Sequence, residues 1–114
     1  MASLDLAHLK RIVGDDPSFI RQVLQIFVRN TPEDMKALFD SVESQSFDQV
    51  SFYAHKLKSA AGAIGYNEAY EDFKRLEVMS KQMAPWPEIT AEVARLSGQC
   101  QACMVDIEDI LGAL

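Results

Sequence analysis

Apolar residues recur at intervals of three and four along nearly the whole chain, and the prolines and glycines fall at breaks between these runs. Such spacing is typical of amphipathic helices, whereas the alternating pattern of strands is almost absent. The breaks occur at Gly14, Pro17, Pro32, Gly65, Pro85 and Pro87. We therefore predict an all-α protein in which each of these residues marks a helix end or start.

The first half of the chain contains three apolar runs. A short helix is predicted over 6–13, ending at Gly14. In Asp16-Pro17, the aspartate is the expected N-cap of a very apolar second helix and the proline is its first residue. Thr31-Pro32 repeats this start signal, so we predict a third helix from there, with a kinked continuation of the second helix as the alternative.

In the second half, Ser46 is the expected start of an amphipathic helix that runs to Gly65. A further helix follows over 66–83, and a stiff Pro-Trp-Pro turn at 85–87 leads into a long last helix. Short connections favour antiparallel neighbours. The predicted architecture is an antiparallel four-helix bundle with a short additional N-terminal helix, forming a single domain over 1–114.

Composition and charge argue against a nucleic-acid-binding protein and against a membrane protein. The 114 residues suit one domain, and 11 basic against 17 acidic residues give a net charge of −6. A net acidic protein is a poor candidate for binding nucleic acid or a membrane surface. No secretory signal and no bilayer-length apolar stretch is visible, so we expect a cytoplasmic protein without direct membrane contact.

Cys100 and Cys103 form a CxxC pair, a spacing that is found in metal-binding sites and in redox-active proteins. A zinc site needs about four ligands, and the other soft ligands, His8 and His55, are distant in sequence. Both thiols also fall on the apolar stripe of the last helix. We therefore expect reduced core cysteines and no bound metal ion.

The residues suited to chemistry lie on the helix predicted after Ser46. At 100° per residue, His55 lies on its outer face, and Ser59 and Gly62 lie on the same side one and two turns later. Lys58 lies at the edge of the apolar stripe, where its ammonium can reach the imidazole. A nucleophilic ring with a cation beside it and small residues downstream suits insertion into another protein's pocket.

The stretch 54–65, AHKLKSAAGAIG, resembles the signature of histidine-containing phosphotransfer (HPt) domains. That signature has an alanine and the acceptor histidine, then a leucine, a lysine and a small residue, and a glycine ten positions after the histidine. The resemblance implies a four-helix bundle in which His55 exchanges a phosphoryl group with the aspartate of a response-regulator receiver domain. It also implies that Lys58 steadies the phosphoryl oxygens. Ser59 stands where the family usually has glycine.

No P-loop, GxGxxG or ATP-binding carboxylate cluster is present. The resemblance therefore implies a phosphocarrier without enzyme activity or cofactor, whose partners are receiver domains and a hybrid sensor histidine kinase. The metal ion of the reaction is expected on the receiver. Two alternatives remain, namely the phosphoacceptor domain of a chemotaxis-type kinase and a non-catalytic docking module for receivers.

A partner surface is predicted around His55, on a chain expected to be monomeric. The stretch 49–67 is the longest without an acidic residue, and it suits an acidic receiver pocket. Phe52 is predicted to be an exposed aromatic anchor one turn before His55. The predicted partner-binding residues are Phe52, Lys56, Ser59, Gly62 and Ala63. We expect His8 to be solvated or partly packed, and Lys74, Arg75 and Lys81 to be ordinary solvated charges.

Overall fold

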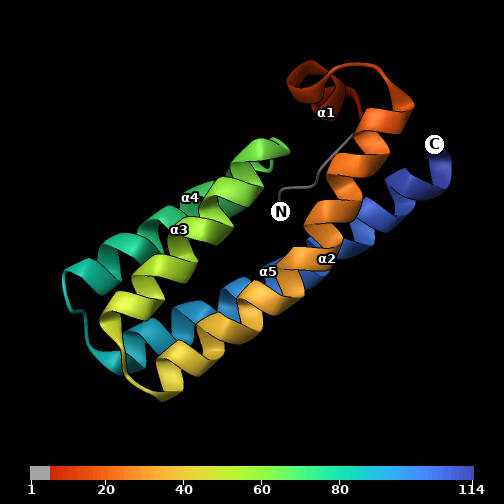
Figure 1. The fold of residues 1–114 in the computed structure, drawn as a ribbon. Helices are drawn as coiled ribbons and strands as arrows, with labels where there is room; N and C mark the ends of the chain where they lie inside the picture. Colours follow the sequence, from red (N-terminus) through yellow and green to blue (C-terminus); the bar gives the residue numbers. More distant parts are fainter. Residues whose placement is uncertain (1–5) are drawn as a thin grey trace.

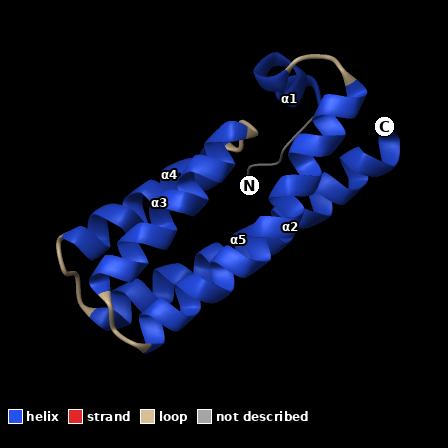
Figure 2. Cartoon of the chain, in the orientation of Figure 1, coloured by secondary structure: helices blue, strands red, loops and turns tan. Residues whose placement is uncertain are grey.

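The computed structural model describes residues 6–114 as five helices joined by short loops, with no strand in that part of the chain (Figures 1 and 2). The helices are α1 (Leu6–Val13), α2 (Pro17–Glu43), α3 (Phe47–Ala63), α4 (Asn67–Lys81) and α5 (Trp86–Ala113). The prediction of an all-α protein is confirmed. None of these helices is both long and apolar enough to cross a bilayer.

Four long helices form an antiparallel bundle in which α3 packs between α2 and α4, and α5 closes the ring against α4 and α2. Figure 1 shows the α3–α4 pair alongside only one half of the longer α2 and α5. The first turns of α2 and the last turns of α5 extend beyond this pair, with α1 beside them, so the molecule measures 43 × 21 × 20 Å. The predicted bundle with a short additional helix is therefore confirmed.

Of the two interpretations of Thr31-Pro32, the separate third helix is wrong and the alternative, a continuation of the second helix, is confirmed. The chain does not begin a new helix at Thr31-Pro32, because α2 continues through Pro32 to Glu43. The reason is that the buried stripe of α2 keeps its phase across the proline. Its members are Ile20, Leu24, Phe27, Thr31, Met35 and Leu38. Packing of this uninterrupted stripe outweighs the single hydrogen bond that a proline removes from a helix.

The helix ends predicted at Asp16, Ser46 and Gly65 agree with the structure, whereas the helix predicted over 66–83 ends at Lys81 and the last helix begins at Trp86, within the turn predicted at 85–87. Asp16 Oδ1 accepts from the backbone N–H of Ser18 at 3.0 Å, and Ser46 Oγ accepts from that of Gln49 at 3.2 Å. Gly65 ends α3 in the left-handed region, with a φ of 73°. A glycine is favoured there because a side chain would strain the backbone.

The turn after α3 is covered by α1. His8 donates from Nε2 to the carbonyl oxygen of Gly65 at 3.0 Å, while Arg11 donates to His8 Nδ1 at 3.2 Å. A β-carbon at position 65 would lie 2.9 Å from His8 Nε2 and from Ile12 Cγ1. His8 is thus partly packed, and it joins the first helix to the end of α3.

Both cysteines lie in the core as free thiols on α5. Burial raises the pKa of Cys100 to about 11 and that of Cys103 to about 12. The thiols are therefore protonated at neutral pH and behave as small apolar side chains, which confirms the interpretation of core cysteines.

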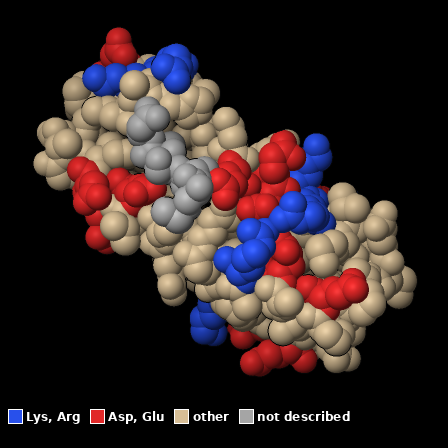
Figure 3. Space-filling model, turned by 180° about the vertical axis from the view of Figure 1, so that it is seen from behind, with Lys and Arg blue, Asp and Glu red and all other residues tan. Residues whose placement is uncertain are grey.

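Basic and acidic side chains are intermingled on the face of the molecule opposite to that of Figure 1, without a large field of one sign (Figure 3). Between α4 and α5, Arg75 pairs with Asp72 at 2.7 Å and with Glu92 at 3.1 Å. Arg95 of α5 also pairs with Asp72, at 3.1 Å. These pairs neutralise one another and fix α4, the helix that faces the predicted histidine, against α5.

Candidate functional site

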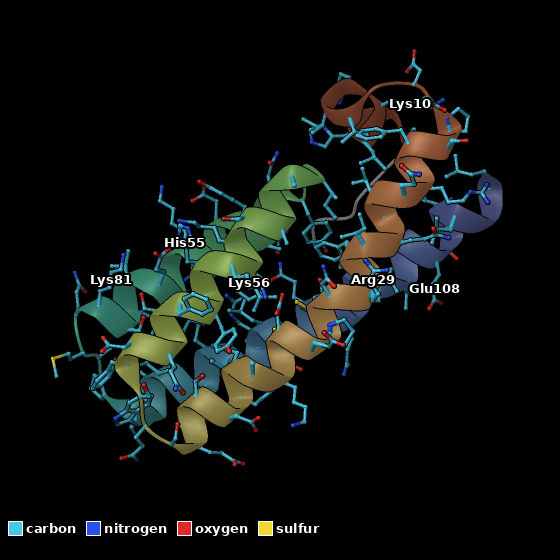
Figure 4. The ribbon with its side chains drawn as sticks, in the orientation of Figure 1. Lys10, Arg29, His55, Lys56, Lys81 and Glu108 are labelled. Carbon is cyan, nitrogen blue, oxygen red and sulfur yellow. The ribbon has the colours of Figure 1, made fainter. Side chains whose placement is uncertain are left out.

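His55 is exposed on α3, as predicted from the helical geometry. The buried stripe of α3 consists of Val50, Ala54, Leu57 and Ala61, and it turns His55 outward. Its side chain is 59% exposed and leans toward α4 (Figure 4). An imidazole in this position is accessible to another protein while one edge of the ring still contacts its own bundle.

The contact on α4 is Glu77, a carboxylate whose side chain is only 10% exposed. His55 Nδ1 lies 3.2 Å from Glu77 Oε2. Lys58 Nζ donates to the other oxygen, Oε1, at 2.9 Å, and Lys81 Nζ donates to Oε2 at 3.1 Å. We call these four residues the Glu77 cluster.

The two lysines keep Glu77 ionised. Burial by itself would raise the pKa of Glu77, but the hydrogen bonds and charges of Lys58 and Lys81 outweigh it and hold the pKa at about 2. The hydrogen bond to Glu77 in turn raises the pKa of Lys58, although burial opposes this shift. The cluster therefore contains one carboxylate and two ammonium groups at neutral pH.

This arrangement fixes which imidazole nitrogen carries the proton. An ionised carboxylate only accepts hydrogen bonds, so Nδ1 of His55 donates to it. In a neutral ring, the lone pair then lies on Nε2. Within the part of the chain that the structure describes, no group hydrogen-bonds to Nε2. The ring thus presents a nucleophilic nitrogen to an incoming electrophile.

The Glu77 cluster also carries a net positive charge, which would attract an anionic group. Two lysines and one glutamate leave one net positive charge beside the imidazole, in a chain whose overall charge is −6. A phosphoryl group on Nε2 would bring negative charge to this point. Charge-assisted hydrogen bonds from ammonium groups are among the strongest that proteins make.

The other predicted site residues separate into two groups. Phe52 is 61% exposed and contacts Tyr53 edge-on, and Ser59 and Ala63 are exposed as expected. Lys56 is exposed too, but its ammonium pairs with Asp34 of α2 at 3.0 Å. It therefore faces α2, on the side of α3 away from the Glu77 cluster.

Gly62 differs from the expectation of an open outer face. It is half-buried, and a β-carbon there would lie 3.1 Å from Cδ2 of Tyr70 on α4. The helical geometry of α3 alone places Gly62 away from the buried stripe, but in the bundle this side of α3 faces α4. Tyr70 of α4 covers the position. The glycine thus permits a close approach between two helices of the bundle, and its contact with a partner stays a prediction.

Sequence reasoning missed Glu77, and it interpreted Lys81 as a solvated charge. One signal was available. Glu77 directly follows Leu76 on the buried stripe of α4, and Lys81 is four residues later, the spacing of a helical ion pair. A carboxylate at the edge of a core needs a compensating partner, so its position pointed to a cation nearby.

A protein-family model described as Hpt domain matches residues 22–111, which include α3 and α4 in full. No curated protein and no solved structure matches the chain.

Proposed function

Because the chain belongs to the Hpt domain family, which carries phosphoryl groups in two-component signalling, we propose that it receives phosphate on Nε2 of His55. The hydrogen bond from His55 Nδ1 to Glu77 carries this proposal. It leaves Nε2 as the nitrogen with a free lone pair on an exposed ring. The family match supports phosphotransfer in general, and the choice of residue and atom rests on this geometry.

The proposed step joins the chain to the phosphorylated aspartate of a receiver domain. The lone pair of Nε2 forms a bond to phosphorus, and the bond from phosphorus to the aspartate oxygen breaks, so the aspartate departs as a carboxylate. The proton on Nδ1 stays in place, and the phosphorylated ring becomes cationic. Glu77 stabilises that positive charge through the hydrogen bond that it already makes.

Lys58 and Lys81 are proposed to neutralise the phosphoryl oxygens. Each ammonium has three N–H donors, of which Glu77 occupies one. The others can therefore turn toward a phosphoryl group on Nε2 while the cluster stays intact. Phosphoryl transfer depends mostly on positioning and charge neutralisation, so two cations held by one carboxylate suit this role.

The proposed role is that of a phosphocarrier between receiver domains, including one attached to a hybrid sensor histidine kinase. Family members act as carriers in such relays. The cluster supports this role over that of a non-catalytic docking module, because docking requires neither a fixed tautomer nor paired lysines.

The proposal is tested by incubating the chain with phosphorylated receiver domains and locating the label. Phosphorus NMR of the denatured product separates Nε2-phosphohistidine from the Nδ1 isomer, and His8→Gln is the control for His55→Gln. We expect the Nε2 isomer, no labelling of His55→Gln and normal labelling of His8→Gln. Labelling on Nδ1 or on His8 would contradict the proposal.

A further inference from the structure

A hollow between α2 and α5 is lined by three sulfur-containing side chains. Its volume is about 160 Å³. Met35 comes from α2, and Cys100 and Met104 come from α5. The two helices lie side by side in Figure 1. Every residue that lines the hollow is uncharged, so sulfur supplies its most reactive groups.

The helical repeat explains why these side chains meet. Cys100 and Met104 are four residues apart on α5, so they lie one above the other on the same side of that helix. Thr31 and Met35 have the same spacing on α2. Because α2 packs against α5, these two pairs form opposite walls of the hollow.

The hollow is separate from the Glu77 cluster. That cluster is built by α3 and α4, whereas α2 and α5 build the hollow. Asp34 of α2 pairs with Lys56 of α3 at 3.0 Å, and Met35 lies about 100° further around α2. Phosphoryl transfer at His55 therefore gives no reason for the sulfur side chains of the hollow.

A buried hydroxyl in the hollow lacks a hydrogen-bond partner. Thr31 is 2% exposed, and its hydroxyl makes no hydrogen bond to any group within residues 6–114. A buried polar group in this state costs free energy. An acceptor that forms inside the hollow would remove that cost.

The sulfur side chains are shielded from bulk water but can be reached from the surface. Met35 and Cys100 are buried, Met104 is half-buried, and Gln101, which also lines the hollow, is exposed. Methionine has three rotatable bonds and a polarisable sulfur, so its side chain can adjust to a bound ion.

We propose that this hollow binds the soft metal ion Cu(I) through the thiolate of Cys100 and the thioethers of Met35 and Met104. Thiolate and thioether ligands select Cu(I) over hard cations. On binding, the S–H bond of Cys100 breaks, its proton passes to solvent, and the sulfur electron pair forms the bond to copper. Copper keeps its oxidation state. The thiolate is then the acceptor that the Thr31 hydroxyl lacks.

Charge selects Cu(I) over Zn²⁺ at this site. One thiolate and one Cu(I) ion sum to zero, so the loaded hollow stays neutral. Zn²⁺ would leave a positive charge in an apolar hollow, and it takes about four ligands from cysteine, histidine and carboxylates. Among the residues that line the hollow, Cys100 alone is of these types, and Cys103 does not line it. The proposed site is therefore different from a zinc site built on the CxxC pair.

The test titrates the full chain with Cu(I) under anaerobic conditions, against the coloured Cu(I) chelator bicinchoninate. We expect one Cu(I) per chain. Cys100→Ala should weaken binding about 100-fold, and Met35→Leu and Met104→Leu about tenfold each, because leucine keeps the volume but removes the sulfur. Cys103→Ala is the matched control, since it removes a buried thiol of α5 outside the hollow, and it should leave the affinity unchanged. Circular dichroism checks that each variant is folded.

Methyl NMR of the methionines locates the ion in the unmodified chain. Ag(I) is the probe, because it prefers the same ligands and is stable in air. One equivalent should shift the methyl signals of Met35 and Met104. Those of Met79 and Met83, which do not line the hollow, should stay in place.

Unchanged affinity in Cys100→Ala, or equal losses in Cys100→Ala and Cys103→Ala, would overturn this proposal. Methyl shifts that exclude Met35 and Met104, one ion per two chains, or displacement of Cu(I) by equimolar Zn²⁺ would overturn it as well. If Cys100→Ala does not fold, the two methionine variants decide, and unchanged affinity in both would contradict the site.

Discussion

Gly62 of α3 lies so close to Tyr70 of α4 that a β-carbon on the glycine would be 3.1 Å from the ring. This contact is two turns from His55, on the side of α3 that also meets Glu77. The close approach at Gly62 therefore helps to set the spacing of the two helices that build the Glu77 cluster.

Gly62→Leu should destabilise the protein by about 1 to 3 kcal/mol, the usual effect of overpacking, because Tyr70 and α4 must move aside. Denaturation with urea measures this effect. Gly98→Leu is the control, since a β-carbon at position 98 meets nothing within 4 Å and leucine favours the helix more than glycine does. Adding Tyr70→Ala should relieve part of the effect of Gly62→Leu; strictly additive free energies for the two substitutions would contradict the close contact.

Lys58→Ala should slow phosphoryl transfer from a receiver about 10- to 100-fold, since a hydrogen bond to a charged group contributes about 1.5 to 3 kcal/mol. The melting temperature should stay near that of the unmodified chain, because Lys81 still compensates Glu77. Stopped-flow transfer and circular dichroism give the two readouts. Lys36→Ala, which removes an exposed lysine that pairs with Asp40, should change neither the transfer rate nor the melting temperature. An unchanged transfer rate in Lys58→Ala would remove Lys58 from the site.

Glu77→Ala should remove the preference of the neutral His55 ring for the tautomer that is protonated on Nδ1. In the unmodified chain, nitrogen NMR of the neutral ring should show hydrogen on Nδ1, whereas Glu77→Ala should show a mixture of tautomers and slower transfer. Glu77→Gln retains an oxygen acceptor, so its tautomer should stay closer to that of the unmodified chain. If all three proteins had the same tautomer, the hydrogen bond would not be what orients the ring.

The lowered pKa of Glu77 predicts a specific dependence of stability on pH. The ionised carboxylate is favoured in the folded state, where its pKa is about 2 against an ordinary value of 4.5. Between these values the unfolded chain binds more protons, so folding stability rises with pH. The contribution is complete above about pH 4.5 and is lost as the pH falls toward 2.

Urea unfolding of the unmodified chain and of Glu77→Gln across this pH range measures that contribution. Asp72 and Glu92 also have lowered pKa values, so both proteins should lose stability in acid. The loss should be smaller for Glu77→Gln. Parallel curves for the two proteins would show that Glu77 does not contribute.

Local patterns were sufficient to predict most of the fold, because caps and breaks such as Asp16, Ser46 and Gly65 act within one turn. The exposure of His55 follows from its angle on a single helix. The two interpretations of Pro32 could not be separated, because the continuity of α2 depends on packing against other helices. Glu77 and the contact between Gly62 and Tyr70 required knowledge of how α4 aligns with α3, which the spacing along one helix does not contain.

The hydrogen bond between His55 and Glu77 has a consequence for the return of phosphate in the proposed relay. A ring that keeps its Nδ1 proton departs from phosphorus as neutral imidazole, a far better leaving group than the imidazolate that a deprotonated ring would become. In the proposed relay, the contact with Glu77 would therefore favour the loss of phosphate from His55 as well as its uptake. Because the same contact would assist both directions, we expect the net flux in the proposed relay to follow the relative phosphorylation of the receivers.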